Sequence, residues 1–451
     1  MGDREIAECL YERLRAECRG DETMGELETL VDRGTREARR LVLERLTRDA
    51  AVRQELGCPQ CGSAMRVVNR SRPRTVESAV GAVRFARDYG RCPDCGTHAY
   101  PADEALGLHG AAHASPRLQE LCALTALRAP AGRAEEDVRR LAGRDVAAST
   151  PHREARRQGG RALAIRGRDA ALSETPEGRA CLAARAPVLP EHSTLIIEID
   201  AWNIRERDCW GETRERREAG EDVGRWHWVY TATVFRPDQR GTTAGDRSVV
   251  ADRGYVATRA GLADFRRQLY AEALQRGLLQ AETTLVLGDG AAWIWNLAGD
   301  QFPQARQRVD QFHVSEHLWG LAAELHGRGT PEAAAWVRPH LSWLERRKDG
   351  ALDVIGSLEE LEAVLAGTAR EAVAREIGYL REHQDRMDYK AAKALGQPCG
   401  SGAIESTCSQ YQRRFKLTGQ FWSLQGDEEL LALDTLHRNG RWHLLFPHDM
   451  A

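Results

Sequence analysis

The segment TLVLGDGAAWIWN, residues 284–296, decides how the fold is interpreted. A run of strand-forming residues ends at Gly288-Asp289-Gly290, and an aromatic-rich, helix-forming stretch follows at once. Glycines on both sides leave the Asp289 carboxylate uncovered at the carboxyl end of a strand, which is where open α/β sheets place their chemistry. The sequence therefore predicts an α/β sheet with a reactive acid at the end of one strand.

A second acid ends another aliphatic run, LIIEID, which covers residues 195–200 and finishes on Asp200. Carboxylate oxygens are the ligands that Mg²⁺ and Mn²⁺ prefer. Two carboxylates at strand ends therefore predict a metal site that acts on phosphate.

Length and composition limit the class of protein. The chain has 451 residues, too many for one hydrophobic core, so we expect two to four domains. No apolar run approaches the roughly 20 residues that a membrane span needs. The charged N-terminus MGDREIAECLYERL lacks the apolar segment of a signal peptide. We therefore expect a cytoplasmic protein of bacterial origin.

Four of the eleven cysteines form two Cys-x-x-Cys pairs about thirty residues apart. Each pair turns the chain so that two thiolates converge, and four thiolates complete a tetrahedral zinc site with no open position. The alternative is a set of four reduced structural cysteines. The spacing predicts a zinc ribbon over residues 57–100, with a structural Zn²⁺ held by Cys58, Cys61, Cys92 and Cys95.

The regions beside the ribbon have helical patterns. Residues 1–56 are expected to form an N-terminal helical region, and residues 101–170 three short helices, the last ending at Gly159-Gly160. From residue 128 to 168 arginines outnumber acids by eleven to five, which is typical of a DNA-binding surface. We interpret 101–170 as a helix-turn-helix, with a solvated helical hairpin as the alternative. Its recognition helix would carry Arg153, Arg156 and Arg157.

Residues 171–192 read as a linker, and the pattern then changes to α/β. Three strands are followed by strands that alternate with helices, which is the order of a ribonuclease H-like sheet. That fold places the first and fourth strands side by side, so Asp200 and Asp289 would face one another. We expect a multidomain α+β protein whose catalytic core comprises a first part (193–326), an all-helical insertion (327–387) and a last part (388–451).

A third acid, Glu405, lies in the segment CGSGAIE, residues 399–405. Ser401 can cap a helix there, and the helix dipole favours a carboxylate in the first turn. Lys416 lies eleven residues later on the same face, so this residue and Arg413 are candidate DNA contacts. On spacing alone, Glu405 could equally be a helix stabiliser.

Four segments together resemble the ISKra-type insertion-sequence transposases, of the Mutator-like group of DDE transposases. They occur in the family's order: IEIDAWNIRERD, LGDGAAWIWNLA, VDQFHVSEHLW and DRMDYKAAKALGQPCGSGAIEST. The resemblance implies a ribonuclease H-like domain with a catalytic, metal-binding triad of Asp200, Asp289 and Glu405. It also implies an accessory pair, Asp310 and His313, although His313 could simply pack in the core. Ala201 departs from the glycine of many relatives.

The resemblance implies a transposase that binds the ends of its insertion sequence and performs DNA cleavage and strand transfer with two Mg²⁺ or Mn²⁺ ions. Its partners would be double-stranded DNA, both terminal repeats and target, and other copies of itself, at least as a dimer associated with the nucleoid. A domesticated sequence-specific DNA-binding protein and a ribonuclease H-like nuclease without strand transfer are the alternatives.

Tryptophans lie close to the acids in the sequence. Trp202, Trp293 and Trp295 could stack on unpaired bases, but we expect them to pack beneath the sheet edge. Trp226 and Trp228 are two apart on a strand and share a face, so we expect them to cover the core.

Overall fold

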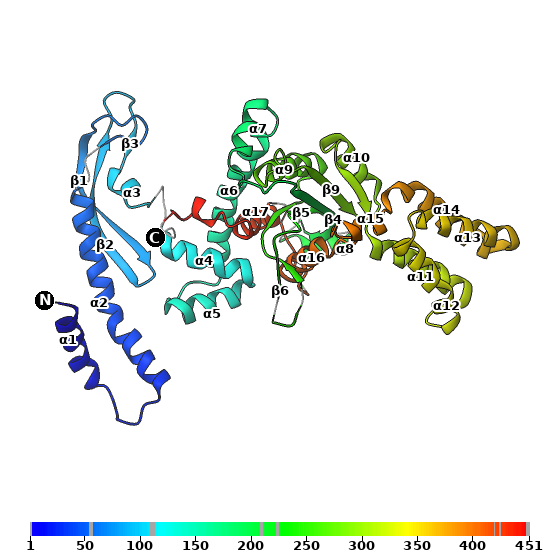
Figure 1. The fold of residues 1–451 in the computed structure, drawn as a ribbon. Coiled ribbons are helices and arrows are strands. Elements are labelled where there is room, and N and C mark those ends of the chain that lie inside the picture. The colour runs from blue at the N-terminus through cyan, green and yellow to red at the C-terminus, as the bar shows by residue number, and fades with distance from the viewer. Residues whose placement is uncertain are drawn as a thin grey trace. The chain divides into compact units, whose positions relative to one another are not determined.

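The computed structural model describes residues 2–53, 57–108, 113–207, 211–221, 225–242, 244–246, 248–418, 420–423 and 425–447. The chain divides into two compact units, Met1–Arg157 and Gln158–Ala451. Both helices and strands are present, as Figure 1 shows, so the prediction of a mixed α and β protein is confirmed. The division falls inside one long helix, whereas the sequence had suggested a linker at 171–192.

The N-terminal unit begins with helices α1 (Asp3–Arg15) and α2 (Met24–Arg53). A three-stranded antiparallel sheet follows, in the order β1 (Arg66–Ser78), β2 (Gly81–Arg91) and β3 (His98–Ala99). Helix α2 is fixed to β2, because the Arg84 backbone N–H donates to the Glu44 carboxylate at 3.1 Å. The described part of 1–56 is therefore helical, as predicted.

Three helices then follow β3: α3 (Pro101–Ala105), α4 (Pro116–Arg128) and α5 (Ala131–Ala142). The Ser115 hydroxyl caps α4 by accepting from the Leu118 N–H at 3.3 Å, as its sequence indicates. Helix α5 ends at Gly143, whose φ of 59° lies in the left-handed region that glycine adopts without strain.

Helix α6 (Ser149–Leu172) corrects one prediction, because it continues through Gly159-Gly160 instead of ending there. A Cβ atom at Gly159 would lie 2.4 Å from the Glu429 carbonyl oxygen. This glycine therefore permits close packing of two helices, and it does not end one. The expected short recognition helix is only the first part of a 24-residue helix.

The expected linker 171–192 is also corrected, because it contains helix α7 (Pro176–Ala183). Thr175 accepts from the Gly178 N–H at 3.1 Å, so Thr175-Pro176 is a helix start that the sequence analysis missed. Leu182 is fully buried against Ala271 and Leu274. This segment is therefore packed structure.

The C-terminal unit contains a five-stranded sheet in the order β10-β9-β4-β5-β8. The central strand β4 pairs in parallel with β9 and antiparallel with β5, so the first strand of this sheet lies beside the fourth, as predicted. A separate pair of short antiparallel strands, β6 and β7, precedes β8. The bounds are β4 (Thr194–Glu206), β5 (Arg225–Phe235), β6 (Arg240–Thr242), β7 (Ser248–Val250), β8 (Arg253–Thr258), β9 (Thr283–Gly288) and β10 (Arg306–Val309).

Helices cover both faces of this sheet, as can be followed in Figure 1. Alternate residues of β4 point to opposite faces. Leu195, Ile197 and Ile199 share the main core with α9 (Leu262–Gln275) and α10 (Ala292–Gln301). The opposite face carries α16 (Gly402–Phe415), which contacts β4 and β5, and α17 (Gly426–Arg438), which contacts β8.

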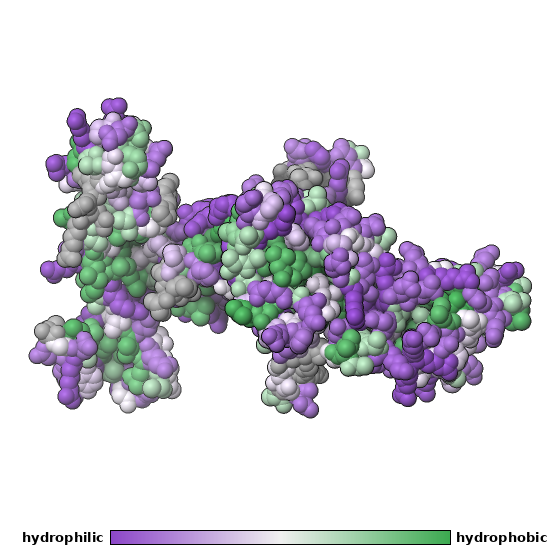
Figure 2. All heavy atoms as spheres, turned by 45° about the horizontal axis from the view of Figure 1, so that its top comes forward, coloured by the Kyte–Doolittle hydropathy of each residue, from purple (hydrophilic) through white to green (hydrophobic). Residues whose placement is uncertain are grey.

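Between β10 and α16 the chain is helical over a longer stretch than the predicted 327–387, and several of these helices pack against one another. Figure 2 shows that its surface is largely hydrophilic. No helix within the described ranges is both long and apolar enough to cross a bilayer. The elements are α11 (Gln311–His326), α12 (Pro331–Arg346), α13 (Gly350–Val364), α14 (Gly367–His383), η1 (Gln384–Arg386) and α15 (Tyr389–Ala394), and elsewhere α8 (Thr213–Glu218) and η2 (Trp442–Leu444).

Candidate functional site

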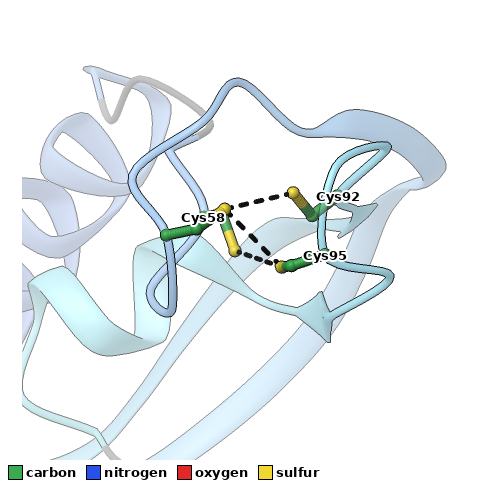
Figure 3. A group of neighbouring side chains, drawn as sticks. Cys58, Cys92 and Cys95 are labelled. Carbon is green, nitrogen blue, oxygen red and sulfur yellow. Dashed lines mark hydrogen bonds between the residues drawn. The ribbon is translucent and has the colours of Figure 1, made fainter.

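The four paired cysteines converge in the N-terminal unit. The Sγ atoms of Cys58 and Cys95 are 3.5 Å apart, and those of Cys61 and Cys92 are also 3.5 Å apart. All four sulfur atoms lie within 4.8 Å of one another, and Figure 3 shows that the sulfurs of the labelled cysteines point toward a common centre. The cluster could therefore hold a structural zinc ion, as the spacing predicted.

Each cysteine pair is shaped by a local turn of the same kind. The Gly62 N–H donates to the Cys58 carbonyl at 2.8 Å, and the Gly96 N–H donates to the Cys92 carbonyl at 3.1 Å. Both glycines have φ near 75°, so a side chain there would strain the turn. Hydrogen bonding with Thr97, first with its hydroxyl, lowers the pKa of the Cys95 thiol to about 6, whereas the pKa of the Cys92 thiol is raised to about 11, with burial as the foremost raising influence. The local chain therefore favours a thiolate at Cys95.

In the C-terminal unit, Asp200 and Asp289 lie on neighbouring parallel strands. The register that joins Glu198 to Leu287 places Asp200 level with Asp289, one residue beyond the end of β9. Burial raises the pKa of Asp200, and the charge of Asp289 raises it further. The two carboxylates are therefore electrostatic neighbours, as predicted. The prediction that Asp200 ends its strand is wrong, because β4 continues to Glu206 in its pairing with β5.

The Gly-Asp-Gly sequence has a structural reason at each glycine. A Cβ at Gly288 would lie 2.8 Å from the Ile294 side chain, so only glycine lets β9 approach α10 this closely. Gly290 has a φ of 108°, which turns the chain from the strand into the helix. Between them, Asp289 accepts from the Ala291 N–H at 2.9 Å, so one carboxylate oxygen is fixed by the turn.

Glu405 lies in the first turn of α16, the helix that packs on β4. Burial raises its pKa, and the charges of Asp310 and Asp200 raise it further. The structure therefore brings Glu405 into the electrostatic environment of the same acids. Asp310 is a fourth member of the group.

Asp310 connects the two helices beside the site. Its carboxylate accepts from the Phe312 N–H at 2.6 Å at the start of α11, and from the Ser401 N–H at 3.0 Å just before α16. The Ser401 hydroxyl also donates to Asp310. The prediction that the Ser401 side chain caps α16 is therefore wrong, because this hydroxyl is used by a buried acid from another element.

His313 lies in the first turn of α11, and its side chain is partly exposed. It forms an ion pair with Glu316 at 3.4 Å, and its charge lowers the pKa of Asp200. His313 is therefore close enough to influence the acids, and the alternative of a core-packing histidine does not describe it.

Three residues around the acids were missed by the sequence analysis. Glu198 is buried, which raises its pKa to about 8, and it accepts from the Ile404 N–H at 2.7 Å. The Cys408 thiol is hydrogen-bonded to Asp200 from one turn beyond Glu405. Arg308, fully buried, holds Asp388 at 2.7 Å and the Pro398 carbonyl at 3.0 Å. Of these three residues, only Glu198 had a signal in the sequence, because it is a charged residue inside the aliphatic run 195–199.

The three acids are more widely spaced than the cysteines. Among the described residues, only the cysteine group has three or more ligand atoms within 4.8 Å of one another. Carboxylate chemistry and the raised pKa values of Asp200 and Glu405 nevertheless fit a cation, because a positive ion would relieve the repulsion between the acids.

The expected DNA-contacting residues are exposed, and they lie in different units. Arg153, Arg156 and Arg157 lie on the first part of α6, in the N-terminal unit apart from the acids. On α16, Arg413 is exposed, and the Lys416 ammonium donates to the Asn203 side chain at 3.1 Å. Lys416 is therefore the one of the five that contacts the strand bearing Asp200.

The tryptophans near the acids divide into two groups. Trp202 and Trp295 are buried and Trp293 packs against the core, as expected. Trp226 and Trp228 are exposed, so the prediction that they cover the core is wrong. Ala232 and Val234, on the same face of β5, are buried in the main core, but this cover does not extend to the first residues of the strand.

No family model and no curated protein matches the chain. The functional assignment therefore depends on the geometry and chemistry of the site.

Proposed function

We propose that the chain is a DDE transposase of the ISKra type, which binds the ends of an insertion sequence and performs metal-dependent DNA cleavage and strand transfer. One observation carries the proposal. Asp200, within β4, lies level with Asp289, which follows the end of the adjacent parallel strand β9, and Glu405 enters their electrostatic environment from the helix packed on β4.

The strand order supports a ribonuclease H-like core. In order of their sequence, the five strands of the sheet are arranged 3-2-1-4-5, with only the second antiparallel to the first strand at the centre. The insertion of α-helices between the second Asp and the Glu supports the same assignment.

The chemistry of the donors fits divalent cations. Mg²⁺ or Mn²⁺, when held by these acids, supplies the charge that activates a water or 3′-hydroxyl nucleophile and stabilises the departing 3′ oxygen. Asp200, Asp289 and Glu405 are the residues that would hold the ions. Their present spacing exceeds that of a closed metal site, so the three carboxylates would have to move closer together to share an ion.

The chain orients the two aspartates through hydrogen bonds. Asp200 accepts from the Ala201 N–H at 2.6 Å and is also hydrogen-bonded to the Cys408 thiol, and Asp289 accepts from the Ala291 N–H at 2.9 Å. One oxygen of Asp289 is therefore fixed by the turn, and its other oxygen is the candidate ligand atom. Asp310 fixes the start of α16, and with it the position from which Glu405 approaches.

The N-terminal unit is proposed to bind the transposon ends. The cysteine cluster, with structural Zn²⁺, would stabilise the ribbon, and helices α4 to α6 would act as a helix-turn-helix. Arg153, Arg156 and Arg157 are exposed on α6 and suited to bidentate phosphate contacts. Synapsis of two DNA ends requires at least a dimer in this proposal.

Replacement of Asp289 by Asn tests the proposal. The full chain is incubated with its element's terminal repeats and Mg²⁺, and nicked and joined products are separated on a gel. Asp289→Asn removes a charged ligand, so we expect cleavage to fall by about 10²-fold or more, with DNA binding retained. Asp300→Asn is the matched control, because Asp300 is an exposed acid on the helix that follows Asp289.

The products distinguish the alternatives. Nicks with joined ends support a transposase, whereas nicks without joining indicate a nuclease of the same fold. DNA binding without metal-dependent nicking, or normal cleavage by Asp289→Asn, would contradict the proposal and favour a DNA-binding protein or a different site.

A further inference from the structure

Strands β4 and β5 continue beyond the acids as a two-stranded extension of the sheet. Strand β4 pairs with β9 only as far as Glu198, whereas its pairing with β5 continues to Glu206 opposite Arg225. This two-stranded extension therefore presents side chains that the central sheet and its helices do not enclose.

Two tryptophans are exposed on one face of this two-stranded extension. Trp226 is 59% exposed and Trp228 57% exposed, and because they are two residues apart on β5 they lie side by side. Two large, neighbouring aromatic side chains left in water are uncommon unless they bind something.

Two arginines and a third aromatic ring extend this group from the side of Trp226. Arg205 lies opposite Trp226 in the strand register, with its guanidinium carbon 5.9 Å from the centre of the tryptophan ring and 5.1 Å from that of Phe421. The guanidinium carbon of Arg207 is 3.6 Å from the centre of the Phe421 ring. The patch therefore combines flat apolar rings with fixed positive charges.

We propose that this patch, formed by Trp226, Trp228, Arg205, Arg207 and Phe421, binds unpaired bases of single-stranded DNA. Aromatic rings stack on bases of any sequence, and arginines neutralise the phosphates that connect the bases. An apolar protein partner would not need the arginines, and a duplex would not expose its bases to the tryptophans. The inference rests on the proposed function, because it specifies that the processed DNA end has an unpaired segment.

Lys416 connects the patch to the acids. Its ammonium bonds Asn203, which lies opposite Trp228, and is 5.7 Å from the centre of the buried Trp202 ring on the other face. Asn203 is three residues from Asp200, or about 10 Å along a strand. A DNA strand cut at the acids could therefore pass over the Lys416 edge and place its next bases on the tryptophans.

The test compares two DNA probes with the full chain in buffer without added Mg²⁺ or Mn²⁺ and without a chelator, so that binding is measured without cleavage and the cysteine cluster keeps its zinc. One probe is a blunt duplex, and the other is the same duplex with a three-nucleotide tail of 2-aminopurine, whose fluorescence falls when it stacks. We expect quenching of the tail and an affinity for the tailed probe at least about tenfold higher. In the double variant Trp226→Ala/Trp228→Ala, both effects should be lost.

Two further variants keep the result interpretable. Trp226→Phe/Trp228→Phe retains flat rings and should keep part of the quenching, which a general loss of folding would not allow. Trp319→Ala removes another tryptophan, 40% exposed on α11, and should change neither measurement. Equal preference for the tailed probe in the wild type and the double alanine variant would overturn the inference.

The inference and the proposed function can fail separately. If metal-dependent nicking is observed but the tail preference does not depend on the tryptophans, only the inference fails. If the tryptophan-dependent preference is present and no DNA is nicked, the patch binds single strands in a protein that is not a transposase.

Discussion

The cysteine cluster and the three acids differ in how their members are brought together. Each cysteine pair is formed by one local turn with its own glycine and hydrogen bonds, and the four thiols already lie within 4.8 Å of one another. The acids come from two strands and a distant helix, and they are spaced more widely. Local geometry therefore produces a closed site suited to a permanent ion, whereas long-range packing produces a looser one suited to ions that arrive with a substrate.

A second acid pair in the C-terminal unit sharpens this contrast. Glu206 and Asp427 are buried together, with Arg259 Nε 2.9 Å from Glu206 and 3.2 Å from Asp427. This pair has its own cation. For Asp200 and Glu405, the foremost influences that lower the pKa are hydrogen bonds, from the Ala201 N–H and the Ser401 hydroxyl. Acids that serve structure are neutralised within the protein, and the candidate catalytic acids are left for an external ion.

The largest expected effect is that of metal removal from the cysteine cluster. If Zn²⁺ fixes the ribbon, the replacement of Cys58 and Cys92 by Ser should unfold residues 57–100 and leave the sheet of the C-terminal unit folded. Structural zinc contributes on the order of 10 kcal/mol in small domains. Hydrogen exchange measured by mass spectrometry, with zinc content in parallel, reports both regions.

Cys9→Ser is the control, because Cys9 is an exposed cysteine outside the cluster. If hydrogen exchange in residues 57–100 is unchanged in the double variant, the cysteine cluster does not need an ion to keep its structure. The cysteine cluster and the acids would then not differ in their dependence on an ion.

A smaller effect is expected where long-range packing determines the backbone. In Gly159→Ala the new Cβ would meet the Glu429 carbonyl at 2.4 Å, so the C-terminal unit should lose about 2–3 kcal/mol of stability. Gly160→Ala is a matched control, since a Cβ there meets nothing within 4 Å and alanine favours the helix by about 0.5–1 kcal/mol. Urea unfolding measures both, and opposite signs are expected. Equal effects would remove packing as the reason for Gly159.

The smallest expected effect is a pH dependence that belongs to the neutralised acid pair. Burial, and then Glu206, raise the pKa of Asp427 to about 8, so the folded protein binds a proton that the unfolded chain releases near pH 4. This contribution to stability is present below pH 4 and is lost as the pH rises toward 8. Because Arg259 also stabilises the charged form, we expect a loss of about 1–2 kcal/mol.

Asp427→Asn keeps the shape of the protonated acid and cannot titrate. Melting temperatures from pH 5 to pH 8 should therefore fall less in this variant than in the wild type. Parallel curves for the two proteins would show that the pair does not share a proton.

The sequence predicted features whose cause is local. The cysteine spacing defines two turns, and the glycines around Asp289 define a strand end, so the cluster and the neighbouring strands β4 and β9 could be anticipated. Gly159-Gly160 misled because its partner, Glu429, is 270 residues away in the chain. The helix cap predicted for Ser401 was wrong because the Ser401 hydroxyl donates to Asp310, which is distant in the sequence. The burial predicted for Trp226 was wrong because no sequence pattern indicates where the helices that cover the sheet end.

The buried contacts at the end of β10 have a consequence for variation in chain length. The Tyr389 hydroxyl donates to the Val309 carbonyl at 3.0 Å, and Arg308 holds Asp388, so the chain leaves and re-enters the sheet at one place. Helices α11 to α14 lie between these two anchors. Insertions or deletions in the part of these helices distant from the sheet can therefore accumulate without altering the distance from Asp200 to Glu405.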